Sequence, residues 1–64
     1  MRHTELDARL REALGDGYAD FWAGRTVIAA LDGRTPHQAL ADGVPPKQVW
    51  AAVWEVLGLP ASQR

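Results

Sequence analysis

The amino-acid sequence predicts an all-α protein, a small bundle of four or five short helices that ends in a helix-turn-helix-like corner. Three observations support this prediction. Apolar residues recur three and four positions apart, which is the spacing of one helix face. Proline and glycine separate these segments where helices begin and end. No alternating run rich in valine, isoleucine and threonine is long enough for a strand.

The composition indicates one globular domain over residues 1–64. Hydrophobic residues make up 47% of the chain, which is typical of folded proteins. The chain contains no cysteine, so the fold must be stable without disulfides. A net charge of −1 argues against binding nucleic acid through charge alone. Because no apolar run approaches the roughly 20 residues of a membrane span and no signal region follows Met1, we expect a cytoplasmic protein without a membrane partner.

The first predicted helix runs from Thr4 to Leu14, with Thr4 as its N-cap and Gly15 as its end. Leu6 and Leu10 lie four residues apart and share one face with Leu14.

A second helix is predicted to begin with Asp16 as its cap. Two apolar clusters follow, and an unbroken helix would place them on different faces. We therefore expect the helix to bend or break near Gly24. The clusters are Tyr18, Phe21 and Trp22, and then Val27, Ile28 and Leu31.

The second half of the chain carries the clearest helix signals. Thr35 before Pro36, with Gln38 at the third helical position, predicts a capping box at the start of a short helix. Gly43 ends that helix, and Pro46 can open a last helix that runs to about Leu57. The last helix has an apolar arc of roughly 160°, so we expect it to be central. The tail, residues 61–64, is expected to be loose.

Catalytic and metal-binding patterns are not recognisable in the sequence. His3 and His37 have no acidic partner at ligand spacing and are interpreted as surface residues. Asp16 and Asp20 are interpreted as residues of a helix start, and Ser62 lies in the tail. We therefore expect no catalytic residue, no metal, no cofactor and no enzymatic activity.

Two binding surfaces are candidates. Ala39, Gly43 and Val49 have the spacing of a helix-turn-helix unit, although any tight helical corner favours a small residue and a glycine. The DNA-reading alternative would use Arg34, Lys47 and Gln48.

The second candidate is a protein interface formed by Trp54, Trp50 and Lys47, because Trp54 lies at the edge of the apolar arc. The alternative for both tryptophans is a place in the core.

Short motifs are spread over the whole chain in a characteristic order. They are Met1-Arg2, Thr4-Glu5, Tyr18-Ala19-Asp20, Trp22-Ala23, Val27, Leu31, Gly33-Arg34-Thr35, Ala39-Leu40, Gly43-Val44, Pro46, Val49-Trp50 and Val53. Together they resemble the DUF3046 family, a set of short actinobacterial proteins of unknown function. At the position of Trp54 the family commonly has cysteine, so this chain departs from the family pattern at that position. The resemblance brings no catalytic residues. It implies a link to DNA recombination and repair, because the family's genes are often found beside those for the bacterial recombinase and its regulator.

These observations predict a non-enzymatic protein-interaction or regulatory module. Its expected partner is a protein, with a DNA-repair protein as one candidate and a second copy of the chain as another. The alternative is a helix-turn-helix-like nucleic-acid-binding protein.

Overall fold

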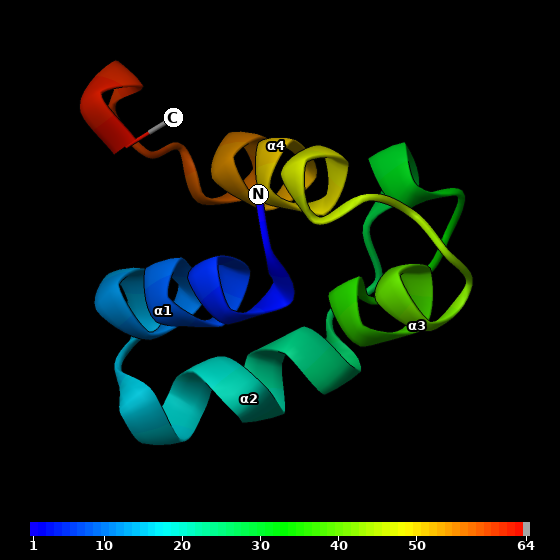
Figure 1. The fold of residues 1–64 in the computed structure, drawn as a ribbon, viewed down its shortest axis with the longest axis horizontal. Coiled ribbons are helices and arrows are strands. Elements are labelled where there is room, and N and C mark those ends of the chain that lie inside the picture. The colour runs from blue at the N-terminus through cyan, green and yellow to red at the C-terminus, as the bar shows by residue number, and fades with distance from the viewer. Residues whose placement is uncertain (64) are drawn as a thin grey trace.

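A computed structural model describes residues 1–63 and shows four α-helices and two short 3-10 helices (Figure 1). Within residues 1–63 the extended pairing is limited to one isolated bridge between Ile28 and Arg34. The predicted all-α bundle is therefore confirmed. In chain order the elements are α1 (His3–Leu14), α2 (Asp16–Arg25), η1 (Ala29–Leu31), α3 (Pro36–Ala41), α4 (Pro46–Leu57) and η2 (Ala61–Gln63).

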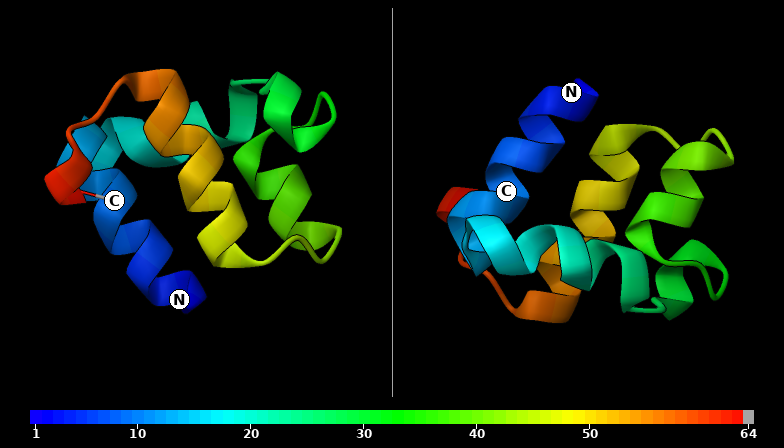
Figure 2. Two further views of the ribbon diagram at one scale, coloured as in Figure 1. Left: turned by 90° about the horizontal axis from the view of Figure 1, so that it is seen from above. Right: turned by 90° about the horizontal axis from the view of Figure 1, so that it is seen from below.

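The α-helices pack in a closed circuit, in which α1 contacts α2, α2 contacts α3, α3 contacts α4, and α4 returns to α1. In Figure 1, α1 lies between α4 and α2, and Figure 2 shows α3 and α4 side by side. Within residues 1–63 no helix has the length and apolar character needed to cross a membrane. The circuit encloses a core of Leu6, Leu10, Ala19, Trp22, Ala23, Ile28, Leu31, Ala39, Val49, Trp50, Ala52 and Val53.

The starts of the first two helices differ from the sequence prediction. The first helix begins at His3, and the N-cap position falls on Arg2, so Thr4 lies inside the helix and is not its cap. Asp16 is the first residue of α2, and Gly15 occupies the N-cap position. Gly15 has φ +91°, a conformation that glycine adopts without strain, and it alone links the two helices. Because the link is one residue long, no side chain is left to cap α2.

The expected interruption near Gly24 is present, since α2 ends at Arg25 and the backbone then becomes extended. This extended segment brings Ile28 into the core, while Val27 is 63% exposed. The Ile28 amide donates a hydrogen bond to the Arg34 carbonyl, 3.0 Å away, which closes the loop around η1.

The second half of the chain follows the sequence prediction closely. The hydroxyl of Thr35 accepts a hydrogen bond from the Gln38 amide, and the Gln38 side chain accepts one from the Thr35 amide. Pro46 is the first residue of α4, and Gly58 ends that helix in the left-handed conformation. The central position expected for α4 is confirmed, because it contacts α3, α1 and η1.

The tail was predicted to be loose, and for residues 61–63 this prediction is wrong. These residues form η2, and the Gln63 carbonyl accepts a hydrogen bond from the indole of Trp50. Arg64, the last residue of the predicted tail, lies outside the described residues. The error has a physical cause: the two partners of this hydrogen bond are far apart in the sequence, and local propensity does not report such a contact.

Candidate functional site

The outer face of α2 carries two large aromatic side chains that the sequence pattern assigned to one cluster with Trp22. Tyr18 and Phe21 are each 54% exposed, whereas Trp22 is 9% exposed. The residues of α2 that face the core are Ala19, Trp22 and Ala23. At 3.6 residues per turn these three positions span an arc of about 100°, and the positions of Tyr18 and Phe21 fall outside it.

The exposed residues are arranged as a contiguous stack. The rings of Tyr18 and Phe21 have centroids 6.2 Å apart and are tilted by 32°. The guanidinium carbon of Arg25 lies 4.8 Å from the centroid of the Phe21 ring. We call these three residues the α2 aromatic surface. Aromatic and arginine side chains are enriched at the energetic centres of protein–protein interfaces, so this is the residue composition of a binding surface.

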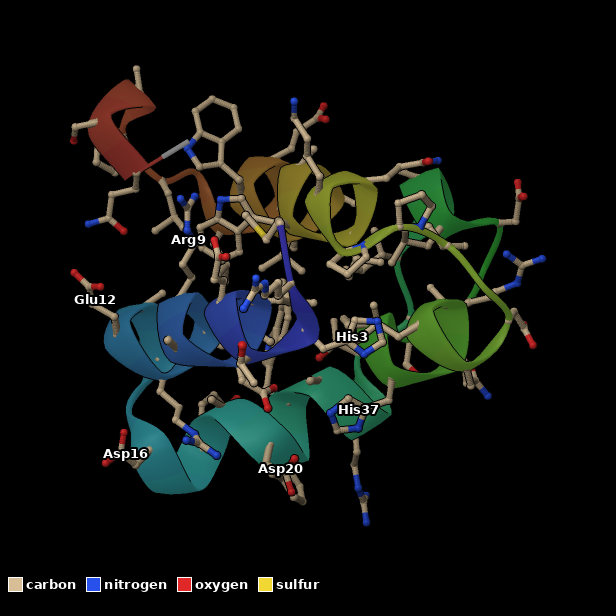
Figure 3. The ribbon with its side chains drawn as sticks, in the orientation of Figure 1. His3, Arg9, Glu12, Asp16, Asp20 and His37 are labelled. Atoms are coloured by element: carbon tan, nitrogen blue, oxygen red, sulfur yellow. The ribbon has the colours of Figure 1, made fainter. Side chains whose placement is uncertain are left out.

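Polar groups flank this surface on the side of α3. His37, at the start of α3, lies beside α2, with its Nε2 atom 3.5 Å from Oδ1 of Asp20 (Figure 3). Gly24 permits this approach, since a Cβ atom there would lie 3.3 Å from Nδ1 of His37. His37 is exposed, as expected, but the expectation that it has no acidic partner is wrong, because Asp20 of α2 lies beside it. Asp16 and His3 are exposed on the helix starts.

The tryptophans of the predicted interface are not equivalent. Trp50 is buried, with 2% of its surface exposed. Trp54 is partly buried, and its indole donates a hydrogen bond of 2.9 Å to the Pro60 carbonyl. Lys47 is exposed on the first turn of α4, two turns before Trp54 and on the same side of the helix. The structure therefore places Trp50 in the core and leaves Lys47 and Trp54 about 10 Å apart along α4.

The predicted nucleic-acid contacts lie at the corner between α3 and α4. Ala39 and Val49 are both fully buried where these helices meet, as the spacing predicted. Lys47 and Gln48 are exposed on the first turn of α4. Arg34 is instead engaged by a carboxylate, because its Nε atom lies 3.2 Å from Oδ2 of Asp42.

Metal-ligating side chains do not cluster in the part of the chain that the structure describes: it contains no group of three or more histidine, aspartate and glutamate residues that could hold a metal ion. The residues that sequence reasoning missed are those of the α2 aromatic surface. The sequence pattern shows Tyr18 and Phe21 only as part of an apolar cluster with Trp22. The position of Arg25, four residues after Phe21 and therefore on the same side of a helix, is the signal that could have indicated this surface.

Comparison with known proteins gives one result. No curated protein and no solved structure matches the chain. The family model of DUF3046, described as a protein of unknown function, matches residues 1–62. This match covers nearly all of the 64 residues, and the chain therefore belongs to the DUF3046 family.

Proposed function

We propose that this protein is a non-enzymatic interaction module that docks on a protein partner through the α2 aromatic surface. The observation that carries the proposal is the exposure of Tyr18 and Phe21, each 54% accessible in a chain with five aromatic residues. Large exposed apolar side chains that adjoin one another mark interaction sites more often than single scattered ones do.

The spacing of the three residues indicates how the partner would bind. Tyr18, Phe21 and Arg25 stand at positions i, i+3 and i+7 of one helix. This is the pattern with which an amphipathic helix places its anchors in an apolar groove of another protein. We therefore expect α2 to lie along a groove, with the rings of Tyr18 and Phe21 inside it.

The chemistry of the partner follows from Arg25. Its guanidinium group stacks on the Phe21 ring, and within residues 1–63 no carboxylate lies within ion-pair distance of it. A guanidinium that stacks on a ring can still bind a carboxylate with its N–H groups. The proposed partner is thus a protein whose apolar groove is bordered by an aspartate or glutamate. One helix face is a small contact area, so we expect a transient complex.

The nucleic-acid alternative has weaker support. Lys47 and Gln48 are exposed, but the charge of Arg34 is offset by Asp42, and the net charge of the chain is −1. A DNA-binding surface needs several cations near the phosphates. A gel-shift series at low salt tests this alternative, and a complex that is lost when Lys47 is replaced by glutamate would favour it over the protein partner.

Capture from the native cell, followed by binding with the purified partner, tests the main proposal. The variants are Phe21→Asp and Arg25→Glu, and Val56→Asp is the matched control because Val56 is 53% exposed on α4. A purified bacterial recombinase is included among the partners, since the family resemblance implies a link to recombination. We expect the dissociation constant to rise at least about tenfold for both α2 variants and to stay unchanged for Val56→Asp.

The structure of the variants is checked by circular dichroism. Because Phe21 and Arg25 lie on the outer face of α2, both variants should keep the helicity of the parent protein. A partner that binds the Phe21→Asp variant as tightly as the parent would overturn the proposal. Sedimentation over a range of concentrations tests the remaining possibility, that the partner is a second copy of the chain.

A further inference from the structure

The chain folds back on itself after α4. Gly58, with φ +64°, reverses the direction of the backbone, and the Leu59 amide donates a hydrogen bond to the Trp54 carbonyl. Leu59 is partly buried against the core, while Pro60 and Ser62 are exposed. We call residues 59–63 the C-terminal strap. Figure 1 shows it at the end of α4, with η2 as its last turn.

Two indole groups of α4 hold the strap by its backbone. The Nε1 atom of Trp54 donates to the Pro60 carbonyl at 2.9 Å, and Nε1 of Trp50 donates to the Gln63 carbonyl at 3.1 Å. The two tryptophans lie one helical turn apart, so their N–H groups are presented in a row. Every peptide has carbonyl groups, and these two hydrogen bonds therefore impose little requirement on the side chains of the bound segment. Selectivity for a particular side chain comes instead from the apolar contact that Leu59 makes with the core.

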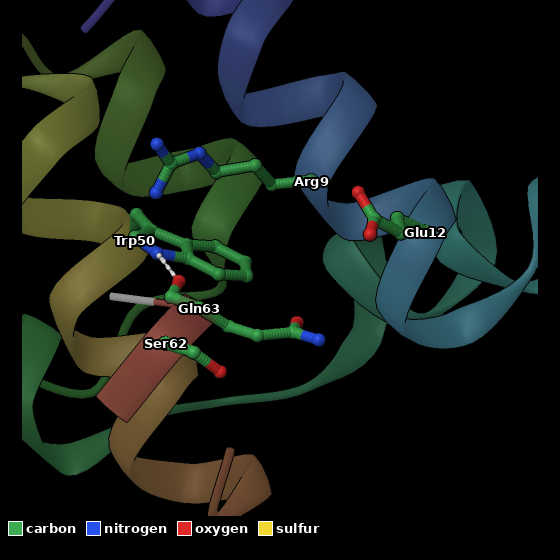
Figure 4. A pocket seen from close by; sticks show the side chains of 5 residues that line it. All are labelled: Arg9, Glu12, Trp50, Ser62 and Gln63. Carbon is green, nitrogen blue, oxygen red and sulfur yellow. Dashed lines mark hydrogen bonds between the residues drawn. The ribbon is translucent and has the colours of Figure 1, made fainter. Parts of the chain in front are cut away.

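The space beside the strap is only partly filled. A hollow of about 340 Å³ is lined by Arg9 and Glu12 of α1, by Trp50, and by Ser62 and Gln63 of the strap (Figure 4). The guanidinium carbon of Arg9 lies 5.7 Å from the centroid of the Trp50 ring. The strap thus forms one wall of a groove whose other walls are helices, and the groove has room for a larger occupant.

Most of the strap is exposed. Leu59 is its one partly buried residue, and residues 60–63 are exposed. Among the described contacts, one apolar side chain and three hydrogen bonds hold it, two from the indoles to carbonyls of the strap and one from the Leu59 amide to the Trp54 carbonyl. A segment of similar chemistry can form the same contacts. Every buried residue of the core lies before the strap in the chain, and the strap adds only the partly buried Leu59 to the core.

From these contacts we infer that the groove between α1 and α4 is a peptide-binding site, which the chain occupies with its own strap when no partner is bound. The ligand is a short segment of another protein that carries a leucine–proline pair. Its leucine takes the place of Leu59, and its carbonyls accept the hydrogen bonds of Trp54 and Trp50. Grooves lined by aromatic side chains are a recurring means of binding proline-containing segments. This site is separate from the α2 aromatic surface and does not depend on it.

Peptide binding to the full chain tests the inference. The probe is a fluorescein-labelled peptide with the sequence of residues 58–63, Gly-Leu-Pro-Ala-Ser-Gln, and binding is followed by fluorescence polarisation. A scrambled peptide that separates the leucine from the proline is the control. The variant Leu59→Ser loosens the strap and should bind the probe at least about tenfold more tightly than the parent. Adding Trp54→Phe, which keeps an aromatic ring but removes the N–H donor, should abolish that gain.

The indole N–H signals in a proton–nitrogen NMR spectrum report the strap directly. We expect the signals of Trp50 and Trp54 to shift in Leu59→Ser and to return when the probe binds, while that of Trp22 stays unchanged. If Leu59→Ser lowers the helicity, Pro60→Gly serves as the second variant.

Two results would overturn the inference. One is that neither strap variant binds the probe, or that the variants bind the scrambled peptide equally well. The other is a dimer of the parent chain that disappears in Leu59→Ser, which would assign the groove to the strap of a second copy. Failure of the Phe21→Asp experiment leaves the peptide site unaffected, because the two surfaces use different residues.

Discussion

The capping box at the start of α3 provides a quantitative prediction. In the variant Thr35→Ala, the Gln38 amide loses its acceptor, which is the Thr35 hydroxyl at 3.1 Å. Loss of an N-cap side chain costs about 0.5–2 kcal/mol, typically about 1 kcal/mol. Thr35 is only 5% exposed, so loss of its methyl group also removes packing. We expect the free energy of unfolding to fall by about 1–2 kcal/mol. For a domain of this size each kcal/mol lowers Tm by about 4–8 °C.

Urea unfolding followed by far-ultraviolet circular dichroism measures this loss, with Thr35→Ser as the matched control because serine keeps the accepting hydroxyl. The reciprocal hydrogen bond, from the Thr35 amide to Oε1 of Gln38 at 3.0 Å, is tested by Gln38→Ala. The two side chains act together, so the double variant should lose less than the sum of the single losses. The reasoning is refuted if Thr35→Ala changes stability by less than about 0.3 kcal/mol, or if Thr35→Ser loses as much as Thr35→Ala.

Two further pairs of variants compare a residue with a matched control in the same unfolding assay. Val53 is fully buried, and Val53→Ala should cost about 2–3 kcal/mol from two lost methyl groups and the resulting cavity. Val56→Ala, on the exposed face of the same helix, should change stability by less than about 0.5 kcal/mol. Gly17→Ala should stabilise the protein by about 0.5–1 kcal/mol, because its added methyl group enters open space on α2. Gly15→Ala should destabilise it by about 1–2 kcal/mol, since φ there is +91°. Equal effects within either pair would contradict the burial or the backbone geometry described above.

The sequence was sufficient where the determinants of structure are local. The capping box of Thr35 and the helix end at Gly58 each involve residues within a few positions of one another, and both were predicted. Two predicted caps were wrong for a reason that is also local. Thr4 and Asp16 have the right side chains, but the N-cap position of α1 falls on Arg2, two residues before Thr4, and Gly15 alone links the two helices.

The candidate surfaces were harder to predict because they depend on contacts between distant segments. Tyr18 and Phe21 have larger apolar side chains than Ala19, but α2 buries Ala19 because a small residue lets the helices approach closely. The strap was missed for a related reason. Its hydrogen bonds to Trp50 and Trp54 form only after Gly58 has reversed the chain, and the composition of residues 61–64 resembles that of a free end.

The contact between α1 and α4 affects how the protein folds during its synthesis. Helices that are adjacent in the chain pack on one another at the other three contacts of the circuit, and such local contacts form quickly. The remaining contact joins opposite ends of the chain. On the ribosome, α1 emerges first, and Leu6 and Leu10 remain without their full set of neighbours until α4 has been made. The circuit of helices therefore closes only after α4 has been synthesised, and a nascent chain that stalls before Pro46 would leave part of the apolar face of α1 exposed to chaperones or to aggregation.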